Sequence, residues 1–318
     1  MLNHKAGSQP DDSRKVFITG GTGFLGKALT SRLTSQGYNV TVLTRKIRKE
    51  EQLPEKTVYL HGDPTLPGKW QDAVQNHAVF INLAGASIFS RWTKKRKKAI
   101  MDSRILTTRH LVEALSARKK QDTLLISASA VGYYGFHGDE LLDEKAFPGD
   151  DFLAKVTVEW EKAARAAEQF GVRIVTTRFG IILEEEGGAL DILSKLVKFG
   201  LGAPLGSGKQ WFSWIHRSDL IECIHYLMTH PEISGPVNCT APNPVTNREL
   251  MKSLRKALKR PVIVPPIPGF LVKLVMGEFG SMVLKGQRIY PPKLMESGFT
   301  FKYPTLDAAL SQKTEYRI

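Results

Sequence analysis

The sequence predicts an α/β fold: a Rossmann-type, doubly wound parallel sheet with a smaller C-terminal α+β domain. Short apolar segments alternate with helical segments over the first two thirds of the chain, which is typical of βαβ units. The apolar residues of these segments stand at consecutive positions, as expected of strands covered on both faces. A chain of 318 residues, 42% of them hydrophobic, can bury one large core and a smaller one.

The elements can be placed in order along the chain. The segment KVFIT at 15–19 predicts the first strand, and apolar residues then recur at helical spacing at Phe24, Leu25, Ala28, Leu29 and Leu33. Further strands are expected at 39–45, 57–63, 78–85, 123–129 and 172–179, and helices at 189–199, 218–228 and 246–258. We expect a first domain at 15–230, with parts of 180–215 contributing to a substrate pocket, and a smaller domain at 231–318.

The first residues, the length of the apolar stretches and the cysteine content limit which classes of protein are possible. Residues 1–14 are polar and lack the apolar core of a secretory signal, so they predict a disordered leader. No stretch reaches the roughly 18 to 20 uninterrupted apolar residues of a membrane span, and no membrane partner is expected. Cys223 and Cys239 are the only cysteines, which excludes a disulfide framework and a multi-cysteine metal cage. We therefore expect no metal and a cytoplasmic protein in a reducing compartment.

The chain is strongly basic, with a formal net charge of +14. The excess is uneven, with 13 Lys and Arg against 5 Asp and Glu between Val245 and Ile318. Such a charge favours an anionic partner such as phosphate, nucleic acid or an acidic lipid surface. No zinc finger, RNA-recognition motif or long basic run with aromatics accompanies it, so nucleic acid is the weakest of these options. A solvated basic surface is the alternative.

A glycine-rich turn follows the first strand. The segment TGGTGFLG at 19–26 places Gly20, Gly23 and Gly26 between a strand and an amphipathic helix. In this context the glycines allow a tight turn, close approach of backbone amides to a pyrophosphate, and close packing of helix on strand. The turn therefore predicts a dinucleotide site, with contacts from Gly20, Thr22, Gly23, Phe24, Leu25 and Gly26.

The residues after the second strand predict which dinucleotide binds. Thr44 is followed by Arg45 and Lys46, where an acidic residue would bind the ribose hydroxyls of NAD. A guanidinium can hold a 2′-phosphate through two hydrogen bonds, so NADP(H) is favoured. An ordinary basic loop is the alternative. Asp63, after the third strand, suits the adenine amino group, although an Asp before Pro64 can equally form a turn.

With these residues placed, the chain resembles the extended short-chain dehydrogenase/reductases of the NAD(P)-dependent epimerase/dehydratase type. More narrowly, it is similar to the atypical subfamily catalogued as nucleoside-diphosphate-sugar epimerases, some members of which carry a cell division inhibitor label. The resemblance rests on segments such as TGGTGFLG, INLAGASI, SASAVGYYG, WFSWIHRSDL and LKGQRIYPPKLMESGF. It implies a small-molecule substrate and the pairing of chains into a homodimer.

The resemblance also implies a catalytic set, and this chain departs from it. In the family, a Ser or Thr after the fifth strand and the Tyr of a Tyr-x-x-x-Lys motif flank the substrate carbonyl. Ser129 matches the first hydroxyl. In DDFLAKVTVEWEK, at 150–162, the Tyr position falls at Phe152 or Leu153 and the Lys position at Val156 or Thr157. Both functional side chains are therefore absent.

A lysine, two tyrosines and two aspartates in or near this segment are the possible substitutes for the missing pair. Lys155 is expected to face solvent, because a lysine two or three positions on does not share the face of the tyrosine. Tyr133 and Tyr134 are the nearest phenols, and Tyr133 is the candidate acid/base, with Arg104 or Arg178 as the cation that assists it. Packing or substrate contact is the alternative for Tyr133. Asp150 and Asp151 are either helix N-caps or carboxylates of the site.

Further contacts are predicted at the carboxyl ends of the strands, where ligands of such sheets bind. The additional cofactor residues are Asn82, Leu83, Ala84, Gly85, Arg104, Ser127, Ala128 and Arg178. The substrate residues are Arg91, Trp92, Tyr134, Lys209, Trp211, Trp214 and His216. The cluster from Lys94 to Lys98 is either a solvated helix face or a clamp for a phosphorylated substrate. A structural role is the alternative for His216, with Asp219 capping the helix that follows.

Together these expectations describe an NADP(H)-binding, epimerase-family oxidoreductase that acts on a small polar substrate, with catalysis by Ser129 and Tyr133. A non-catalytic NADP(H)-binding sensor or regulator is the alternative from another class. A basic protein associated with nucleic acid is a third and weaker option.

Overall fold

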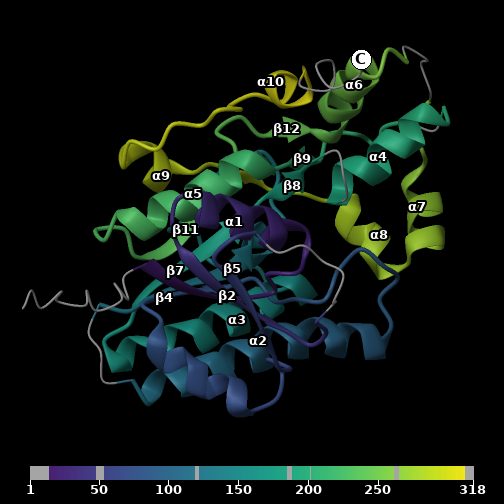
Figure 1. Cartoon of the computed structure of the whole chain (residues 1–318). Coiled ribbons are helices and arrows are strands. Elements are labelled where there is room, and N and C mark those ends of the chain that lie inside the picture. The colour runs from purple at the N-terminus through teal and green to yellow at the C-terminus, as the bar shows by residue number, and fades with distance from the viewer. Residues whose placement is uncertain are drawn as a thin grey trace, which may run out of the picture.

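A seven-stranded parallel sheet forms the centre of the molecule (Figure 1). The computed structural model describes residues 14–47, 54–118, 122–184, 188–200, 202–260 and 265–311, so the predicted leader lies outside the described residues apart from Arg14. The strands are β1 (Lys15–Thr19), β2 (Asn39–Thr44), β3 (Thr57–His61), β4 (Val79–Asn82), β5 (Leu124–Ala130), β7 (Arg173–Phe179) and β11 (Gly235–Cys239). Their order in the sheet is β11-β7-β5-β4-β1-β2-β3.

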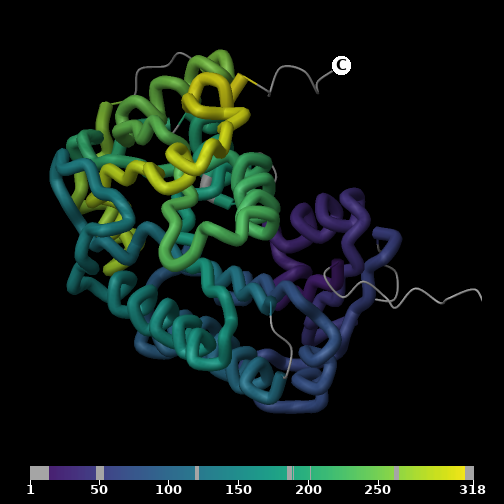
Figure 2. Tube along the Cα trace, turned by 90° about the vertical axis from the view of Figure 1, so that its left-hand side faces the viewer, coloured from purple at the N-terminus to yellow at the C-terminus, as the bar shows by residue number. Residues whose placement is uncertain are grey.

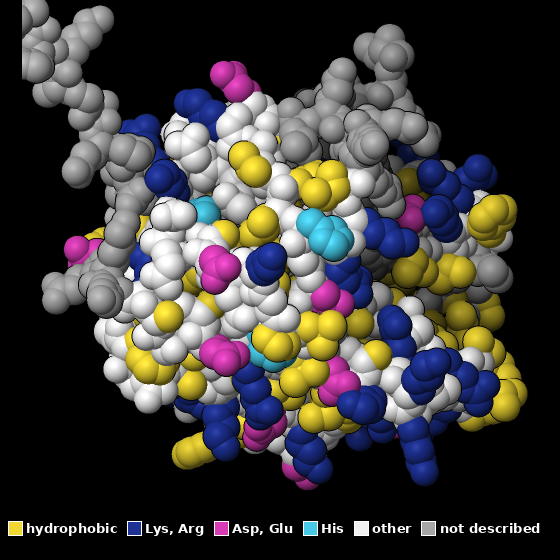
Figure 3. Space-filling view, turned by 60° about the horizontal axis from the view of Figure 1, so that its bottom comes forward, with side chains coloured by type: hydrophobic (Ala, Val, Ile, Leu, Met, Phe, Trp, Pro, Cys, Tyr) yellow, Lys and Arg dark blue, Asp and Glu magenta, His cyan; other side chains and the backbone are white. Residues whose placement is uncertain are grey.

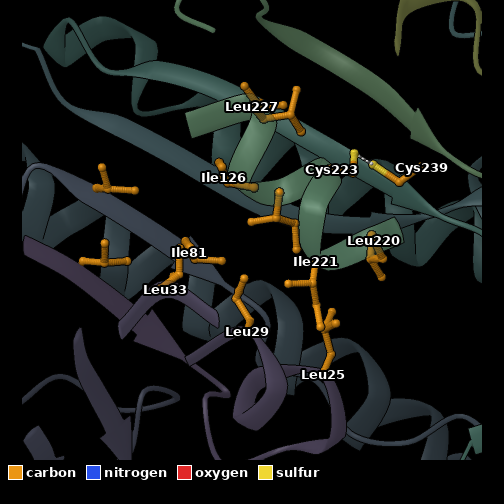
Figure 4. Close-up of a cluster of buried hydrophobic side chains, with 14 of the residues drawn as sticks. Leu25, Leu29, Leu33, Ile81, Ile126, Leu220, Ile221, Cys223, Leu227 and Cys239 are labelled. Atoms are coloured by element: carbon orange, nitrogen blue, oxygen red, sulfur yellow. Dashed lines mark hydrogen bonds between the residues drawn. The ribbon is translucent and has the colours of Figure 1, made fainter. Parts of the chain in front are cut away.

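Helices cover both faces of the sheet, which confirms the doubly wound fold. Helices α1 (Phe24–Ser35) and α5 (Arg217–Thr229) pack on one face, and α2 (Lys94–Ser116), α3 (Phe152–Arg165) and the 3-10 helix η2 (Lys69–Asn76) on the other. In β1, Val16 and Ile18 pack toward the first layer and Phe17 toward the second, as the alternation of a strand requires. Figure 4 shows leucines of α1 and α5 meeting Ile81 and Ile126 of the sheet.

The remaining elements gather at one side of this sheet, mostly from the C-terminal third (Figure 2). They are η3 (Val131–Tyr134), β6 (Leu141–Leu142), β8 (Ile181–Leu183), α4 (Gly188–Lys198), β9 (Trp211–Phe212), β10 (Trp214–His216), β12 (Val245–Thr246), α6 (Asn247–Ala257), α7 (Gly269–Met276), α8 (Glu278–Val283), β13 (Arg288–Ile289), α9 (Pro292–Glu296) and α10 (Leu306–Ser311). The short 3-10 helix η4 (Glu168–Phe170) instead joins α3 to the start of β7. A separate core cluster joins α4, α6 and α10 around Trp214. No helix in the described part of the chain combines the length and the apolar character needed to cross a bilayer.

The predicted domain boundary between residues 230 and 231 is wrong. β11, at 235–239, pairs in parallel with β7 and is the seventh strand of the main sheet. It escapes prediction because it is short, contains Pro236, and joins the sheet only after the chain has formed β8, α4, β9, β10 and α5. Its place at the edge of the sheet explains how a proline is tolerated there.

The order of the strands fixes where a ligand can bind. β1 lies between β2 and β4, so the connections after β1 and β4 leave toward opposite directions along the sheet. Such a reversal opens a crevice at the carboxyl ends of these two strands. The glycine turn after β1 and the segment after β4 both lie at this point.

Candidate nucleotide and substrate site

The turn after β1 leaves no room for side chains. Gly20 has φ of +73°, and a Cβ atom there would lie 2.7 Å from the carbonyl carbon of Leu83. A Cβ atom on Gly26 would lie 2.3 Å from the carbonyl oxygen of Gly20. Both contacts are with backbone, which cannot move aside cheaply. The turn therefore brings β1, the start of α1 and the end of β4 together at their closest possible approach.

The amino end of α1 is bare. Gly23 is its N-cap and provides no side chain, and no acidic residue stands in the first turn. The other long helices whose caps are described all begin with a side chain that accepts from the backbone, namely Thr93 for α2, Asp151 for α3, His216 for α5 and Thr246 for α6. The first-turn amides of α1 therefore have no side-chain cap, and together with the positive end of the helix dipole they can bind an anion.

Arg45 and Asp63 lie at the ends of the neighbouring strands β2 and β3. Arg45 and Lys46 are exposed. Asp63 Oδ1 accepts hydrogen bonds from Thr65 N at 2.9 Å and from Thr65 Oγ1 at 2.7 Å, so the aspartate does form a turn. Burial raises the pKa of Asp63, but these bonds and the Arg45 charge outweigh it, and the net shift is downward. Arg45 is thus held near the edge of the sheet, with its charge facing solvent.

Asn82 and Ser127 belong to a buried network under the site. Thr19 Oγ1 donates to Asn82 Oδ1 at 2.6 Å, and Asn82 Nδ2 donates to Thr108 Oγ1 at 2.8 Å and to Ser127 Oγ at 3.3 Å. The network joins β1, β4, β5 and α2 where the strands end. The side chains of Asn82 and Ser127 are therefore occupied in the network under the site. A cofactor contact at these two positions would be made by backbone atoms, as we also expect for Leu83, Ala84 and Ala128.

Arg104 is a half-buried cation beside Gly85, in the segment after β4. Its Nη1 donates to the carbonyl oxygens of Ala86 and Ile100, both at 3.0 Å, and its guanidinium lies 5.2 Å from the Trp160 ring. Burial, with the nearby Arg96 charge, lowers the pKa of Arg104 to about 10. No carboxylate of the described residues pairs with it. A buried charge without a counter-ion is costly, so the surroundings favour an anionic ligand here.

The predicted catalytic serine takes part in a closed polar network. Ser129 Oγ donates to Glu161 Oε1 at 2.7 Å, and Arg178 donates to both oxygens of Glu161 at 2.8 and 2.9 Å. Arg178 also donates to Tyr134 Oη at 2.9 Å, and Tyr134 donates to Asn238 Oδ1 at 2.6 Å. All five side chains are buried. Tyr134 and Arg178 therefore pack and pair charges in the interior, and the burial of Tyr134 is inconsistent with its predicted contact with substrate.

Tyr133 is the accessible phenol of this region. It is half-buried on η3, and the Arg178 guanidinium lies 3.5 Å from the centre of its ring. Asp151 caps α3, as one of its two readings predicts, by accepting from Leu153 N at 2.8 Å and Ala154 N at 3.2 Å. Lys155 is exposed, as predicted. The helix that would carry the acid/base pair is therefore well formed, without a lysine on its inner face.

The predicted substrate residues divide into two groups. Trp214 is fully buried and donates to the carbonyl oxygen of Asn243, which makes it a core residue rather than a ligand contact. Trp92 is also buried, in a cluster with Phe152 and Phe279. Arg91, Lys209 and Trp211 are accessible and remain candidates.

The basic segment from Lys94 to Lys98 forms the start of α2. Lys97 Nζ pairs with Glu278 Oε1 at 2.5 Å, and Lys98 Nζ pairs with Asp102 Oδ2 at 2.5 Å. Figure 3, which brings the bottom of Figure 1 forward, shows Lys and Arg side chains interspersed with acidic and hydrophobic ones. This arrangement favours the reading of a solvated helix face.

The family follows from comparison with known proteins. The model of the NAD dependent epimerase/dehydratase family matches residues 16–239. The chain belongs to this family. A second model, described as a domain of unknown function (DUF1731), matches residues 267–312.

Several members of the epimerase/dehydratase family are similar over nearly the whole chain. The Epimerase family protein SDR39U1 homolog, chloroplastic, of Arabidopsis thaliana is 39% identical over 313 residues, covering 95% of this chain and 87% of the relative. The Epimerase family protein YfhF of Bacillus subtilis (strain 168) is 41% identical over 298 residues, covering 93% and 97%. The crystal structure of human epimerase family protein SDR39U1 (isoform2) with NADPH superposes with a TM-score of 0.82 at 30% identity, covering 95% of this chain and 100% of that chain.

Two residues of this family member escaped the sequence analysis. Glu161 could have been noticed as a charge on the buried face of α3, at helical spacing from Ala154, Thr157 and Ala164. Arg288 lies on β13, 4.5 Å from the Trp211 ring, and its Nε is buried without a partner among the described residues. Nothing in its local sequence signals this position, because β13 reaches the site only by pairing with β6.

His216 has the structural role that was its alternative reading. Its Nδ1 accepts from Ser218 N at 3.2 Å and caps α5, and its ring lies 4.1 Å from that of Tyr303. The prediction that Asp219 caps this helix is wrong, since Asp219 lies within α5 and accepts from the backbone of Lys302 and Tyr303, each at 2.9 Å. The helix begins at Arg217, one residue before the predicted start at 218.

The buried cap makes stability depend on pH. Burial, with the charges of Arg217 and Lys302, lowers the pKa of His216 to about 4. Between about pH 6.5 and pH 4, His216 is protonated in the unfolded chain and neutral in the folded chain. Lowering the pH through this range therefore favours the unfolded chain and reduces the free energy of unfolding. His216→Asn keeps a capping oxygen and does not titrate. We expect its free energy of unfolding to fall by about 2 to 3 kcal/mol less than that of the parent over this pH range. Urea unfolding across this pH range measures it, and equal declines in both proteins would contradict it.

Proposed function

We propose that the chain binds NADP(H) at the carboxyl edge of its sheet and acts as an epimerase-family oxidoreductase on a small polar substrate. The observation that carries the proposal is the bare start of α1, placed behind a turn that excludes side chains at Gly20 and Gly26. The related human protein of known structure was crystallised with NADPH, which supports the same cofactor here.

Each charged part of this cofactor would meet a matching group of the chain. The amides of the first turn of α1 would hold the pyrophosphate. Arg45, assisted by Lys46, would bind the 2′-phosphate, and Asp63 Oδ2 would accept from the adenine amino group. Arg104, which has no carboxylate partner among the described residues, would add a second cation near the pyrophosphate. When bound, NADP(H) supplies or accepts a hydride at its nicotinamide ring.

The chain's own part in the chemistry would be to hold the substrate and move a proton. Tyr133 is the proposed proton donor, because it is the accessible phenol four residues after Ser129 and the Arg178 guanidinium lies 3.5 Å from the centre of its ring. The Ser129 hydroxyl donates its hydrogen bond to Glu161 Oε1 in the structure, so it would polarise a substrate oxygen only after rotating to donate to the substrate instead. Arg91, Lys209, Trp211 and Arg288 would surround the substrate. Their charge favours an anionic substrate, for example a phosphorylated one.

One observation favours a second candidate function. The network of Ser129, Glu161 and Arg178 is closed, and the positions of the family's Tyr and Lys are apolar or hydroxyl-bearing. A protein with this site could bind NADP(H) as a sensor or regulator without turnover. The two candidates differ in NADPH oxidation with a panel of aldehydes, quinones and sugar nucleotides. Oxidation that depends on Tyr133 would establish the enzyme, and tight binding without oxidation would establish the sensor.

The experiment that tests the cofactor proposal is a binding titration of Arg45→Ala. We expect the Kd for NADPH to rise about 10- to 100-fold, since one charge-assisted clasp of a phosphate is lost, while binding of NADH is unchanged. Lys162→Ala removes the same charge from an exposed position on α3 and should bind both as the parent does. Equal binding of NADPH and NADH by the unaltered chain would refute the proposal.

Both cysteines bear on the setting of this function. Cys223 and Cys239 are free thiols, buried, with their sulfur atoms 3.4 Å apart. A close pair of cysteines without a disulfide suits a reducing compartment, and on that ground we propose the cytosol for this function.

A further inference from the structure

Helix α7 exposes most of its large apolar side chains to solvent. It buries Val272, at 5% exposure, and shows Phe270, Leu271, Leu274 and Val275 to solvent at 69%, 39%, 71% and 75%. These four residues lie on one face of the helix, at positions one, four and five residues apart. A surface helix of a globular protein normally turns such a face to the core. This face of α7 therefore lacks the partner that would cover it.

Helix α4 shows the same feature at a neighbouring end. It exposes Ile192 and Leu196 at 49% and 38%, and Phe199, directly after its last residue, at 81%. The segment after α4 is hydrogen-bonded to the segment before α7, with Gly206 N donating to the oxygen of Ile267 at 2.8 Å and Ile267 N donating to that of Pro204 at 2.9 Å. This pairing ties the end of α4 to the start of α7 (Figure 1). We call the seven exposed side chains of the two helices the α4–α7 apolar surface.

The charges of the two helices indicate what covers this surface. Lys195 and Lys198 stand beside the apolar residues of α4, and Lys273 beside those of α7. The one acidic residue among these elements, Asp191, is bonded to Lys195 at 2.8 Å. Lysine side chains can extend past an apolar face that is immersed in a lipid interface and reach the headgroups. A basic rim around exposed Phe, Leu, Ile and Val is therefore complementary to an anionic bilayer.

A second copy of the chain fits these observations less well. A two-fold contact through this surface would place the lysines of both copies in one interface, where Asp191, already bonded to Lys195, is the one carboxylate of the two helices. An anionic lipid surface instead supplies the negative charge that these lysines lack.

We infer that the α4–α7 apolar surface docks the protein on anionic membranes, with Phe199, Phe270, Leu274 and Val275 entering the interface. This contact is peripheral, and it is independent of the proposed cofactor site, because none of these residues lies at the carboxyl edge of the sheet. The neighbouring α8 packs against Trp92 through Phe279, so the docked face would lie next to the predicted substrate side of the molecule.

The test is sedimentation of the full-length, NADPH-loaded chain with vesicles. We expect it to pellet with vesicles of equal parts phosphatidylcholine and phosphatidylserine, and not with phosphatidylcholine alone. Leu274→Gln combined with Val275→Gln should weaken the partition about 100-fold, because two large apolar side chains leave the interface. Lys198→Glu combined with Lys273→Glu should weaken it at least tenfold for the anionic vesicles. All four positions are exposed, so these variants should fold.

Phe147→Ser is the matched control, since Phe147 is 88% exposed but lies outside these helices. It should sediment as the parent does. Absence of pelleting with the anionic vesicles, or an equal loss in Phe147→Ser, would overturn the inference. So would a concentration-dependent dimer, detected by light scattering, that the Leu274→Gln/Val275→Gln variant abolishes, because a second copy would then be the occupant. NADPH titration of each variant should be unchanged, which separates this test from that of the proposed function.

Discussion

Gly26→Ala is expected to weaken NADPH binding by about 100-fold or more. The new Cβ atom would lie 2.3 Å from the oxygen of Gly20 and 2.5 Å from the Cα of Gly21, so the start of α1 must shift away from the turn. The first-turn amides then lose their aim at the pyrophosphate, and two charge-assisted hydrogen bonds of about 1.5 kcal/mol each account for the loss. Fluorescence titration of the purified variant with NADPH measures this effect.

The chain offers a matched glycine for this experiment. A Cβ atom on Gly138 would meet nothing within 4 Å, and its φ lies outside the left-handed region. Gly138→Ala should therefore bind NADPH normally. Circular dichroism of both variants should show the same helix content, so that loss of the site is distinguished from loss of the fold. A Gly26→Ala protein that binds as tightly as Gly138→Ala would remove the main support for the cofactor site.

The second large effect is expected at the buried ion pair. Glu161→Ala should lower the free energy of unfolding by about 3 to 5 kcal/mol, because it leaves the buried Arg178 charge without its partner. Burial lowers the pKa of Arg178, and its bonds to Glu161 and Tyr134 outweigh this and raise it. A guanidinium keeps its proton in proteins, so removing the glutamate leaves a buried charge that has lost its main stabilising partner. Urea denaturation at neutral pH measures the loss.

Two further variants separate pairing from packing. Asp102→Ala breaks the exposed pair with Lys98 on α2 and should cost less than about 1 kcal/mol. Replacing both buried partners together, as Glu161→Leu with Arg178→Met, should recover much of the stability, since neither charge is then left alone. If Glu161→Ala cost no more than Asp102→Ala, the pair would not be the organising contact of this region.

Local patterns were sufficient for the first half of the fold. β1 occupies 15–19 as predicted, and the glycine spacing placed the turn and the start of α1. Three predicted strands, at 39–45, 57–63 and 78–85, ended one to three residues too late, as at Gly62 and Asp63 after β3. These features depend on residues near one another in the sequence, where periodicity and glycine positions carry the information.

The errors concern residues whose partners are distant in the sequence. Tyr134 was predicted to face a ligand, but Asn238, 104 residues further on, accepts its hydroxyl. Asp219 was predicted to cap a helix, but it binds the backbone at 302 and 303. β11 was assigned to the second domain because its pairing with β7 has no local signal. Short-range patterns hold no record of these contacts, which depend on how the C-terminal third folds back.

The position of β11 also has a consequence during synthesis. The ribosome must release the chain as far as Cys239 before β7 gains its outer neighbour. At roughly 5 to 20 residues per second, the ribosome needs several seconds to synthesise residues 180–234. During this time β7 is an exposed edge strand with unpaired backbone amides and carbonyls. Neighbouring nascent chains on one messenger RNA could pair with each other through these exposed strand edges. Slow translation over this stretch, or a chaperone bound to β7, would protect the newborn protein from aggregation.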